Sequence, residues 1–267
     1  MFVRIITLIW IEIYKMLHLK LTYFFIICSL AIILFWGVSS SIFFPNSSQQ
    51  GIGYIFLLTS NQTTISFLGT IFIMIFCSLL VSAETASGTL QTNLVNPISR
   101  IEFLSAKLVV GWLFSLILVI MMALPALIIG GFKFGYGNYV EEGLVLFTRQ
   151  EIFSEIIVCY LVVSVVLVAY VSYSLFISVL IPNPGYAIGL CVGVALMMDF
   201  VRVRMNISSF IFQSYIETPF ELAKGIAEGF KGTWRPDVYF CILVPLAWAI
   251  IFFTLALYLF ARKDYKS

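Results

Sequence analysis

The chain has 267 residues, of which 61 % are hydrophobic and 10 % are charged, and its formal net charge is +2. A soluble domain carries about 25 % charged residues, and one globule of this length cannot bury so much apolar surface. The composition therefore excludes a soluble protein and indicates an all-α polytopic membrane protein. The small net charge gives no indication of nucleic-acid binding.

Residues 1–20 are predicted to form an amphipathic helix that lies in the membrane interface. At 100° per residue, its polar side chains fall within an arc of about 140°. These side chains are Arg4, Thr7, Glu12, Lys15 and His18. We expect the polar face to meet water and the apolar face to lie among the lipid headgroups. The alternative is that the segment is the polar start of the first span.

Six apolar stretches are long enough to cross a bilayer, for which a helix needs about 20 residues. They cover residues 21–44, 64–83, 108–131, 156–181, 186–205 and 238–260. Residues 47–64 are polar but uncharged and contain Gly51 and Gly53, so we expect a loop there. The sequence Pro182-Asn183-Pro184-Gly185 predicts a tight turn between the fourth and fifth spans. Pro125 predicts a kink in the third span.

A polar island, residues 84–107, separates the second and third spans. The chain contains no charged residue from Leu21 to Ala83, and none from Leu108 to Phe132. A polar loop that links two spans is where a membrane protein can contact a soluble partner.

The island is expected to contain a short helix, a turn and a second helix, and the alternative is a plain re-entry loop. Pro97 disfavours the helical conformation at the residue before it. Ser99 and Glu102 have the spacing of a capping box, which predicts a helix start that continues into the third span.

The island also carries a recognisable series of residues. It contains Glu84, Gly88-Thr89-Leu90, Pro97-Ile98-Ser99-Arg100 and Lys107. In this position between the second and third of six spans, the series resembles the signature of ABC-2 type transporter permeases, and the resemblance covers essentially the whole chain. It implies that the island is a coupling helix that docks on a cytoplasmic ATP-binding subunit. The ATPase-coupling residues implied in this way are Glu84, Gly88, Thr89, Pro97, Arg100 and Lys107.

The resemblance also implies the orientation and the partners. The island and both termini would face the cytoplasm from the inner membrane, whereas Lys and Arg are almost equally divided between the two sides. The chain contains no G-x-x-x-x-G-K-[ST] phosphate loop, so ATP and magnesium are expected on two separate ATPase subunits. We expect no cofactor, metal or catalytic centre in this chain. Because members of the family need two membrane bundles, a second permease copy or homologue is implied.

Two features near the fifth span are candidate contacts for a substrate or for a second subunit. Asp199 and Arg202 are one helical turn apart and can pair, either as an anchor at the outer headgroup level or as a substrate or dimer contact. Gly189 and Gly193 form a G-x-x-x-G pair, which lets helices approach closely between subunits or within one bundle.

A short external helix is expected before the sixth span. Thr218-Pro219-Phe220-Glu221 has the pattern of a capping box with proline at the first helical position. Phe220, Ala223, Ala227 and Phe230 would form its apolar stripe.

These observations favour a membrane subunit of an ATP-driven exporter for a hydrophobic or amphipathic substrate, such as a lipid, drug or peptide. The alternative is a secondary carrier driven by an ion gradient. Such a carrier is expected to have charged or interrupted helices at mid-membrane, and the first three spans show none.

Overall fold

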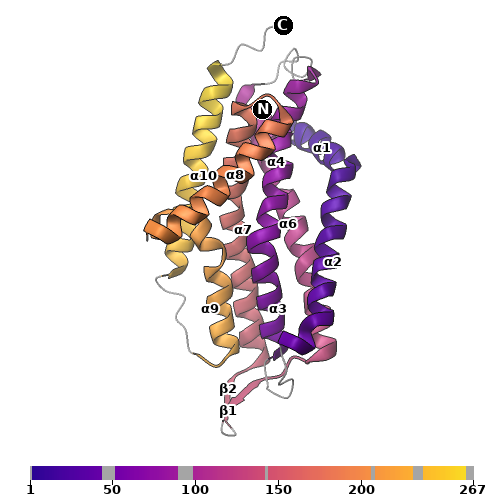
Figure 1. The fold of residues 1–267 in the computed structure, drawn as a ribbon, viewed down its shortest axis with the longest axis vertical. Coiled ribbons are helices and arrows are strands. Elements are labelled where there is room, and N and C mark those ends of the chain that lie inside the picture. The colour runs from indigo at the N-terminus through magenta and orange to yellow at the C-terminus, as the bar shows by residue number, and fades with distance from the viewer. Residues whose placement is uncertain are drawn as a thin grey trace.

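A computed structural model describes residues 2–43, 52–89, 99–141, 144–205, 208–230 and 237–262. Its helices form an elongated bundle, with α1 and the last turn of α10 at one end and a two-stranded hairpin at the other (Figure 1). The elements are α1 Phe2–His18, α2 Lys20–Phe43, α3 Ile52–Thr63, the π-helical turn η1 Thr64–Gly69, α4 Thr70–Ala86, α6 Arg100–Lys133, β1 Tyr139–Glu141, β2 Leu144–Phe147, α7 Arg149–Leu180, α8 Pro184–Met205, the 3-10 helices η2 Ser208–Phe210 and η3 Phe212–Ile216, α9 Thr218–Ala227 and α10 Asp237–Arg262.

Six helical stretches in the described residues are long and apolar enough to cross a membrane. They are α2, the continuous α3–η1–α4 stretch, α6, α7, α8 and α10. The predicted all-α, six-span architecture is therefore confirmed. Helices are expected here because a helix satisfies its own backbone hydrogen bonds, which lipid cannot do.

The second span is longer than expected. Residues Ile52–Ala86 form one helical stretch of 35 residues, so the loop predicted for 47–64 is wrong from Ile52 onward. Uncharged polar side chains suggested the loop, but they bond to their own helix. The hydroxyl of Thr64, for example, donates to the carbonyl oxygen of Ser60 at 2.7 Å, as polar side chains inside helices commonly do.

Gly53 supports close packing rather than a turn. A Cβ atom at this position would lie 2.2 Å from the backbone oxygen of Gly135 and 3.0 Å from the ring of Tyr136. The start of α3 therefore packs directly against the segment that follows α6, which only glycine permits.

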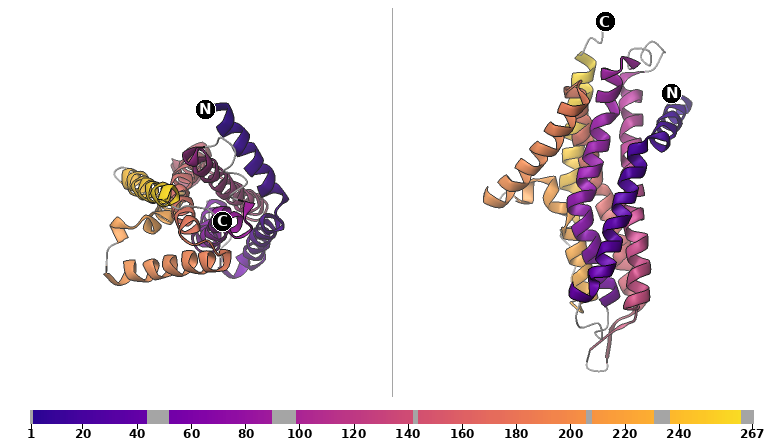
Figure 2. Two further views of the ribbon diagram at one scale, coloured as in Figure 1. Left: turned by 90° about the horizontal axis from the view of Figure 1, so that it is seen from above. Right: turned by 45° about the vertical axis from the view of Figure 1, so that its right-hand side comes forward.

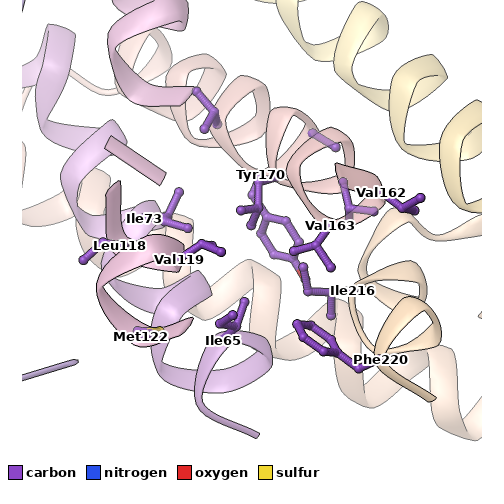
Figure 3. Close-up of a cluster of buried hydrophobic side chains, with 14 of the residues drawn as sticks. Ile65, Ile73, Leu118, Val119, Met122, Val162, Val163, Tyr170, Ile216 and Phe220 are labelled. Atoms are coloured by element: carbon purple, nitrogen blue, oxygen red, sulfur yellow. The ribbon is translucent and has the colours of Figure 1, made fainter. Parts of the chain in front are cut away.

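The core of the bundle lies where α4, α6 and α7 meet η3 and α9. Figure 3 shows two facing sets of buried side chains in this region. One set comes from η1, α4 and α6, and the other from α7, η3 and α9: Ile65, Ile73, Leu118, Val119 and Met122, and Val162, Val163, Tyr170, Ile216 and Phe220. Outside this core the spans keep apolar faces exposed, as lipid-facing helices do.

Helix α8 is the least buried span, since only 17 % of its apolar stretch is buried inside the bundle. It follows a turn that confirms the prediction for residues 182–185, and the Asn183 side chain accepts a hydrogen bond from the backbone N–H of Gly185 at 3.0 Å. Figure 2 shows α8 running obliquely, so that its far end stands away from the neighbouring helices. Its 22 residues correspond to about 33 Å, against about 48 Å for α7, so α8 ends well short of the hairpin end (Figure 1).

The segments at the hairpin end refine two expectations. Strands β1 and β2 pair in antiparallel fashion between α6 and α7. Helix α9 is present, and it packs against α3 and α7. Its predicted capping box is wrong, because the cap residue is Glu217 and the Thr218 hydroxyl instead donates to the backbone oxygen of Ser214 at 3.2 Å. Of the predicted stripe, Phe220 is fully buried but Phe230 is 68 % exposed.

Candidate functional site

Four charged side chains from three helices meet at the α1 end of the bundle. Glu12 and Lys15 come from α1, Glu84 from α4 and Lys107 from α6. Lys107 Nζ lies 3.1 Å from Glu12 Oε2 and 3.0 Å from Glu84 Oε1. Lys15 Nζ lies 2.8 Å from a carboxylate oxygen of each of the same two residues. We call these four side chains the charge cluster.

The charge cluster is neutral overall and partly withdrawn from solvent. The side chain of Lys107 is 1 % exposed, that of Glu12 is 9 % exposed and that of Glu84 is 14 % exposed. A buried ammonium group is tolerated only when it is paired, and Lys107 has two carboxylates beside it. Its Nζ also lies 4.8 Å from the centre of the Phe103 ring, a favourable cation–π distance.

Lys15 closes the charge cluster on the more exposed side. Partial burial acts to lower the pKa of Lys15, but its hydrogen bonds to Glu12 and Glu84 and their negative charges outweigh this effect, so the pKa is raised above 10.5. Lys15 therefore keeps its charge at neutral pH and neutralises the carboxylates that Lys107 approaches from inside.

The expectation that the polar face of α1 meets water is wrong for Glu12. Glu12 is only 8 % exposed, whereas Trp10 on the apolar side of the same helix is 68 % exposed. The physical reason is Lys107, a buried cation on α6 that requires a carboxylate partner. Lys15 and His18 are exposed, in agreement with the prediction.

Arg100 joins the start of α6 to the end of α10. Its guanidinium group donates to the backbone oxygen of Phe260 and, at 2.7 Å, to that of Ala261. These carbonyl oxygens lie in the last turn of a helix, where they have no helical partner. The capping box predicted for Ser99 is confirmed, because Ser99 and Glu102 cap each other's backbone N–H groups.

Gly88 and Thr89, two further residues implied by the resemblance, lie at the first end of the island. Gly88 has a φ of +72°, and a Cβ atom there would meet nothing within 4 Å. This left-handed conformation follows the last turn of α4, as glycine commonly does after a helix. Ser87 and Thr89 are exposed, and their hydroxyl oxygens lie 2.9 Å apart. Pro97 and the coupling helix expected around it lie outside the described residues.

The candidate residues of α8 lie in two different environments. Asp199 Oδ1 is 2.6 Å from Arg202 Nε, and both residues line a cavity beside Tyr170 of α7. The end of α8 that carries them does not reach the hairpin end of the bundle (Figure 1), where an outer anchor was expected, because α8 is short and oblique. A Cβ atom at Gly189 or Gly193 would meet nothing within 4 Å, so packing of this pair within one bundle is wrong.

Reasoning from the sequence missed residues of the charge cluster and of the cavity beside α8. Glu12 and Lys15 were interpreted only as parts of an amphipathic helix, and Thr59, Ser66 and Gln213 were not singled out. Thr59, Ser66 and Gln213 line a cavity between the second span and α8. The available signal was the polar but uncharged stretch before the second predicted span. Among the described residues, no group of three or more His, Cys, Asp or Glu side chains is placed to hold a metal ion.

Comparison with known proteins places these features in a family context. A sequence model described as ABC-2 family transporter protein matches residues 8–194. The uncharacterized protein YhcI of Bacillus subtilis (strain 168) is 21 % identical over 224 residues, which cover 79 % of this chain and 70 % of that protein. The matched region contains the whole charge cluster and the first half of α8.

Proposed function

Because the chain belongs to the ABC-2 family of transporter proteins, we propose that it is the permease subunit of an ATP-driven exporter. Members of this family are transmembrane subunits that work with ABC ATPases. In the proposal, two cytoplasmic ATPase subunits bind ATP and magnesium, and both ends of the permease chain face them from the inner membrane. The substrate is hydrophobic or amphipathic.

The observation that carries the coupling proposal is that both ends of the island are tied to other helices. At the first end, Glu84 bonds to Lys15 of α1 and to Lys107 of α6. At the second end, Arg100 holds the carbonyl oxygens at the end of α10. A force on the island is therefore transmitted to α1, α4, α6 and α10 together rather than absorbed by a loose loop.

In this mechanism the charged residues of the island act as internal connectors. Lys107 is buried, so it relays motion between α1 and α6, whereas the exposed Ser87 and Thr89 are free to approach an ATPase. Closure of the ATPases on ATP pushes the island, and the connected helices change the side from which the substrate pathway is accessible. The chemistry of ATP hydrolysis stays on the ATPase subunits.

We also propose that two bundles form the working unit. Gly189 and Gly193 leave a shallow strip on the exposed side of α8, and small residues let two helices approach closely in lipid. The second bundle is a copy of this chain or a homologous permease.

The proposed coupling is tested with the permease and its ATPase reconstituted together in liposomes. Glu84→Ala and Arg100→Ala should lower ATP turnover stimulated by the permease while both proteins still copurify. Arg262→Ala is the matched control, because this exposed arginine at the same end lies over the Tyr258 ring and forms no ion pair with the described residues of the island.

Full stimulation by both island variants would contradict the coupling proposal. Transport that requires an ion gradient and proceeds without ATP would instead support the secondary carrier. Both results are measured as substrate accumulation and phosphate release in the same vesicles.

A further inference from the structure

A polar cavity of about 440 Å³ lies between α3, η1 and α4 on one side and α8, η3 and α9 on the other. Met74 and Thr59 mark its two ends along the second span. At 1.5 Å per residue they lie about 15 Å and about 37 Å from the level of Glu84. The apolar part of a bilayer is about 30 Å thick. With the level of Glu84 at one surface of this layer, the cavity extends from mid-membrane toward the hairpin side.

Three uncharged lining side chains carry a buried polar atom without a hydrogen-bond partner in the described part of the chain. These atoms are Thr59 Oγ1, Ser66 Oγ and Gln213 Oε1. Gln213 is 5 % exposed, and its amide nitrogen donates to the backbone oxygen of Ala195 at 3.1 Å, which fixes the orientation of the side chain. Buried polar groups are almost always paired, so three unpaired ones around one cavity point to a ligand that supplies the missing partners.

The backbone beside these atoms is also unusual. Residues Thr64–Gly69 form a π-helical turn, and such turns are frequently found at functional sites. The Thr70 hydroxyl donates to the backbone oxygens of Ser66 and Phe67 at 2.8 and 3.0 Å. This contact stabilises the widened turn, and Ser66 within that turn lines the cavity.

The opposite wall carries charges that balance. Asp199 and Arg202 of α8 form an ion pair, and Glu217 and Lys224 line the same cavity from the η3–α9 side. Two acidic and two basic side chains give the cavity no net charge, so a ligand with a single net charge would leave the occupied site charged. A zwitterion can approach a basic and an acidic side chain at the same time.

The rim of the cavity is apolar and lies on the outer surface of the bundle. Phe67 is 57 % exposed and Leu196 is 49 % exposed, and both line the cavity. In a membrane this surface meets lipid chains. A ligand can therefore place a polar group inside the cavity and leave an apolar part outside, along α4 and α8.

We infer that this cavity binds the headgroup of a zwitterionic phospholipid, with the phosphate toward Arg202 and Lys224 and the ammonium toward Asp199 and Glu217. The inference rests on the proposed transport function for its physiological meaning, and it assigns the substrate class. A volume of 440 Å³ is within the range of about 300–1,000 Å³ typical of small-molecule sites.

The experiment measures binding to the purified full chain in a neutral detergent, without nucleotide and without ATPase. Three fluorescent probes with identical acyl chains are compared: phosphatidylethanolamine, phosphatidylglycerol and diacylglycerol. Fluorescence anisotropy should show saturable binding of phosphatidylethanolamine, at least about tenfold tighter than binding of the other two, because only this probe engages both signs of charge.

Two variants assign the binding to the cavity. Ser66→Ala and Gln213→Leu should each weaken phosphatidylethanolamine binding by about three- to tenfold, which corresponds to the loss of one hydrogen bond. Ser164→Ala is the matched control, because its hydroxyl already donates to the Leu161 carbonyl oxygen on an exposed face of α7, and it should bind like the wild type. If Gln213→Leu does not elute as a folded protein, Ser66→Ala carries the test.

Equal affinity for the three probes, tighter binding of phosphatidylglycerol, or unchanged binding by both variants would each overturn the inference. The assay contains no ATPase, so its result does not depend on the coupling proposal. In turn, retained coupling in Glu84→Ala and Arg100→Ala would leave a positive binding result intact.

Discussion

Lys107 Nζ on α6 lies 3.1 Å from Glu12 Oε2 on α1, although 95 residues separate them in the chain. This contact holds the amphipathic helix α1 against the bundle. It links α1 to the last residue of the island that is proposed to receive the ATPase.

Lys107→Met should destabilise the protein by about 3–5 kcal/mol, the usual cost of removing one partner from a buried ion pair. Lys15→Met should cost about 1 kcal/mol or less, because Lys15 is 43 % exposed and exposed pairs contribute little. Thermal unfolding of the detergent-solubilised chain measures both. Equal losses for the two variants would show that the buried pair has no special role.

The charge of Lys15 should make stability depend on pH in the alkaline range. Its pKa in the folded state is raised above 10.5, so its stabilising contribution is complete below about 10.5 and is lost as pH rises through the folded-state pKa. Arginine stays protonated throughout this range. Thermal unfolding between about pH 9 and pH 12 should therefore show a steeper loss in the wild type than in Lys15→Arg, and parallel profiles would contradict the prediction.

Gly53→Ala should destabilise the protein by about 1–3 kcal/mol, as insertion of a methyl group into a packed site usually does. The new Cβ atom would lie 2.2 Å from the backbone oxygen of Gly135, whereas one at Gly137 would meet nothing within 4 Å. Gly137→Ala is therefore the control for the same thermal measurement. A normal unfolding temperature for Gly53→Ala would argue against the α3 packing described above.

Gly193→Leu should reduce the dimer fraction without unfolding the single bundle, because its Cβ position is open. Gly111→Leu should instead reduce the yield of folded protein, since a Cβ atom there would lie 2.7 Å from Val171 Cγ1. Mass measurement of the solubilised complex distinguishes the two effects. An unchanged dimer in Gly193→Leu would exclude α8 from the interface.

The proposed orientation predicts opposite labelling of the two ends of the bundle. Ser87→Cys and Asn138→Cys each place a thiol at an exposed position, the first in the island and the second before the hairpin. An impermeant thiol reagent applied to intact cells should label only Asn138→Cys. Labelling of Ser87→Cys under these conditions would reverse the topology.

The sequence by itself determined the features that depend on composition or on neighbours in the chain. Lipid requires helices with apolar surfaces, so six apolar stretches specified six spans. The Ser99–Glu102 capping box and the Asn183 turn were predictable because each involves residues at most three positions apart.

The tertiary structure alone decided which polar groups lie inside. The helix at Ile52–Thr63 looked like a loop, because polar side chains satisfied by their own helix cannot be distinguished in sequence from those that face water. The burial of Glu12 depends on Lys107, a partner far along the chain. The cavity around Ser66 and Gln213 is closed on one side by the oblique α8, and the direction of a helix is set by contacts between elements that no local pattern encodes.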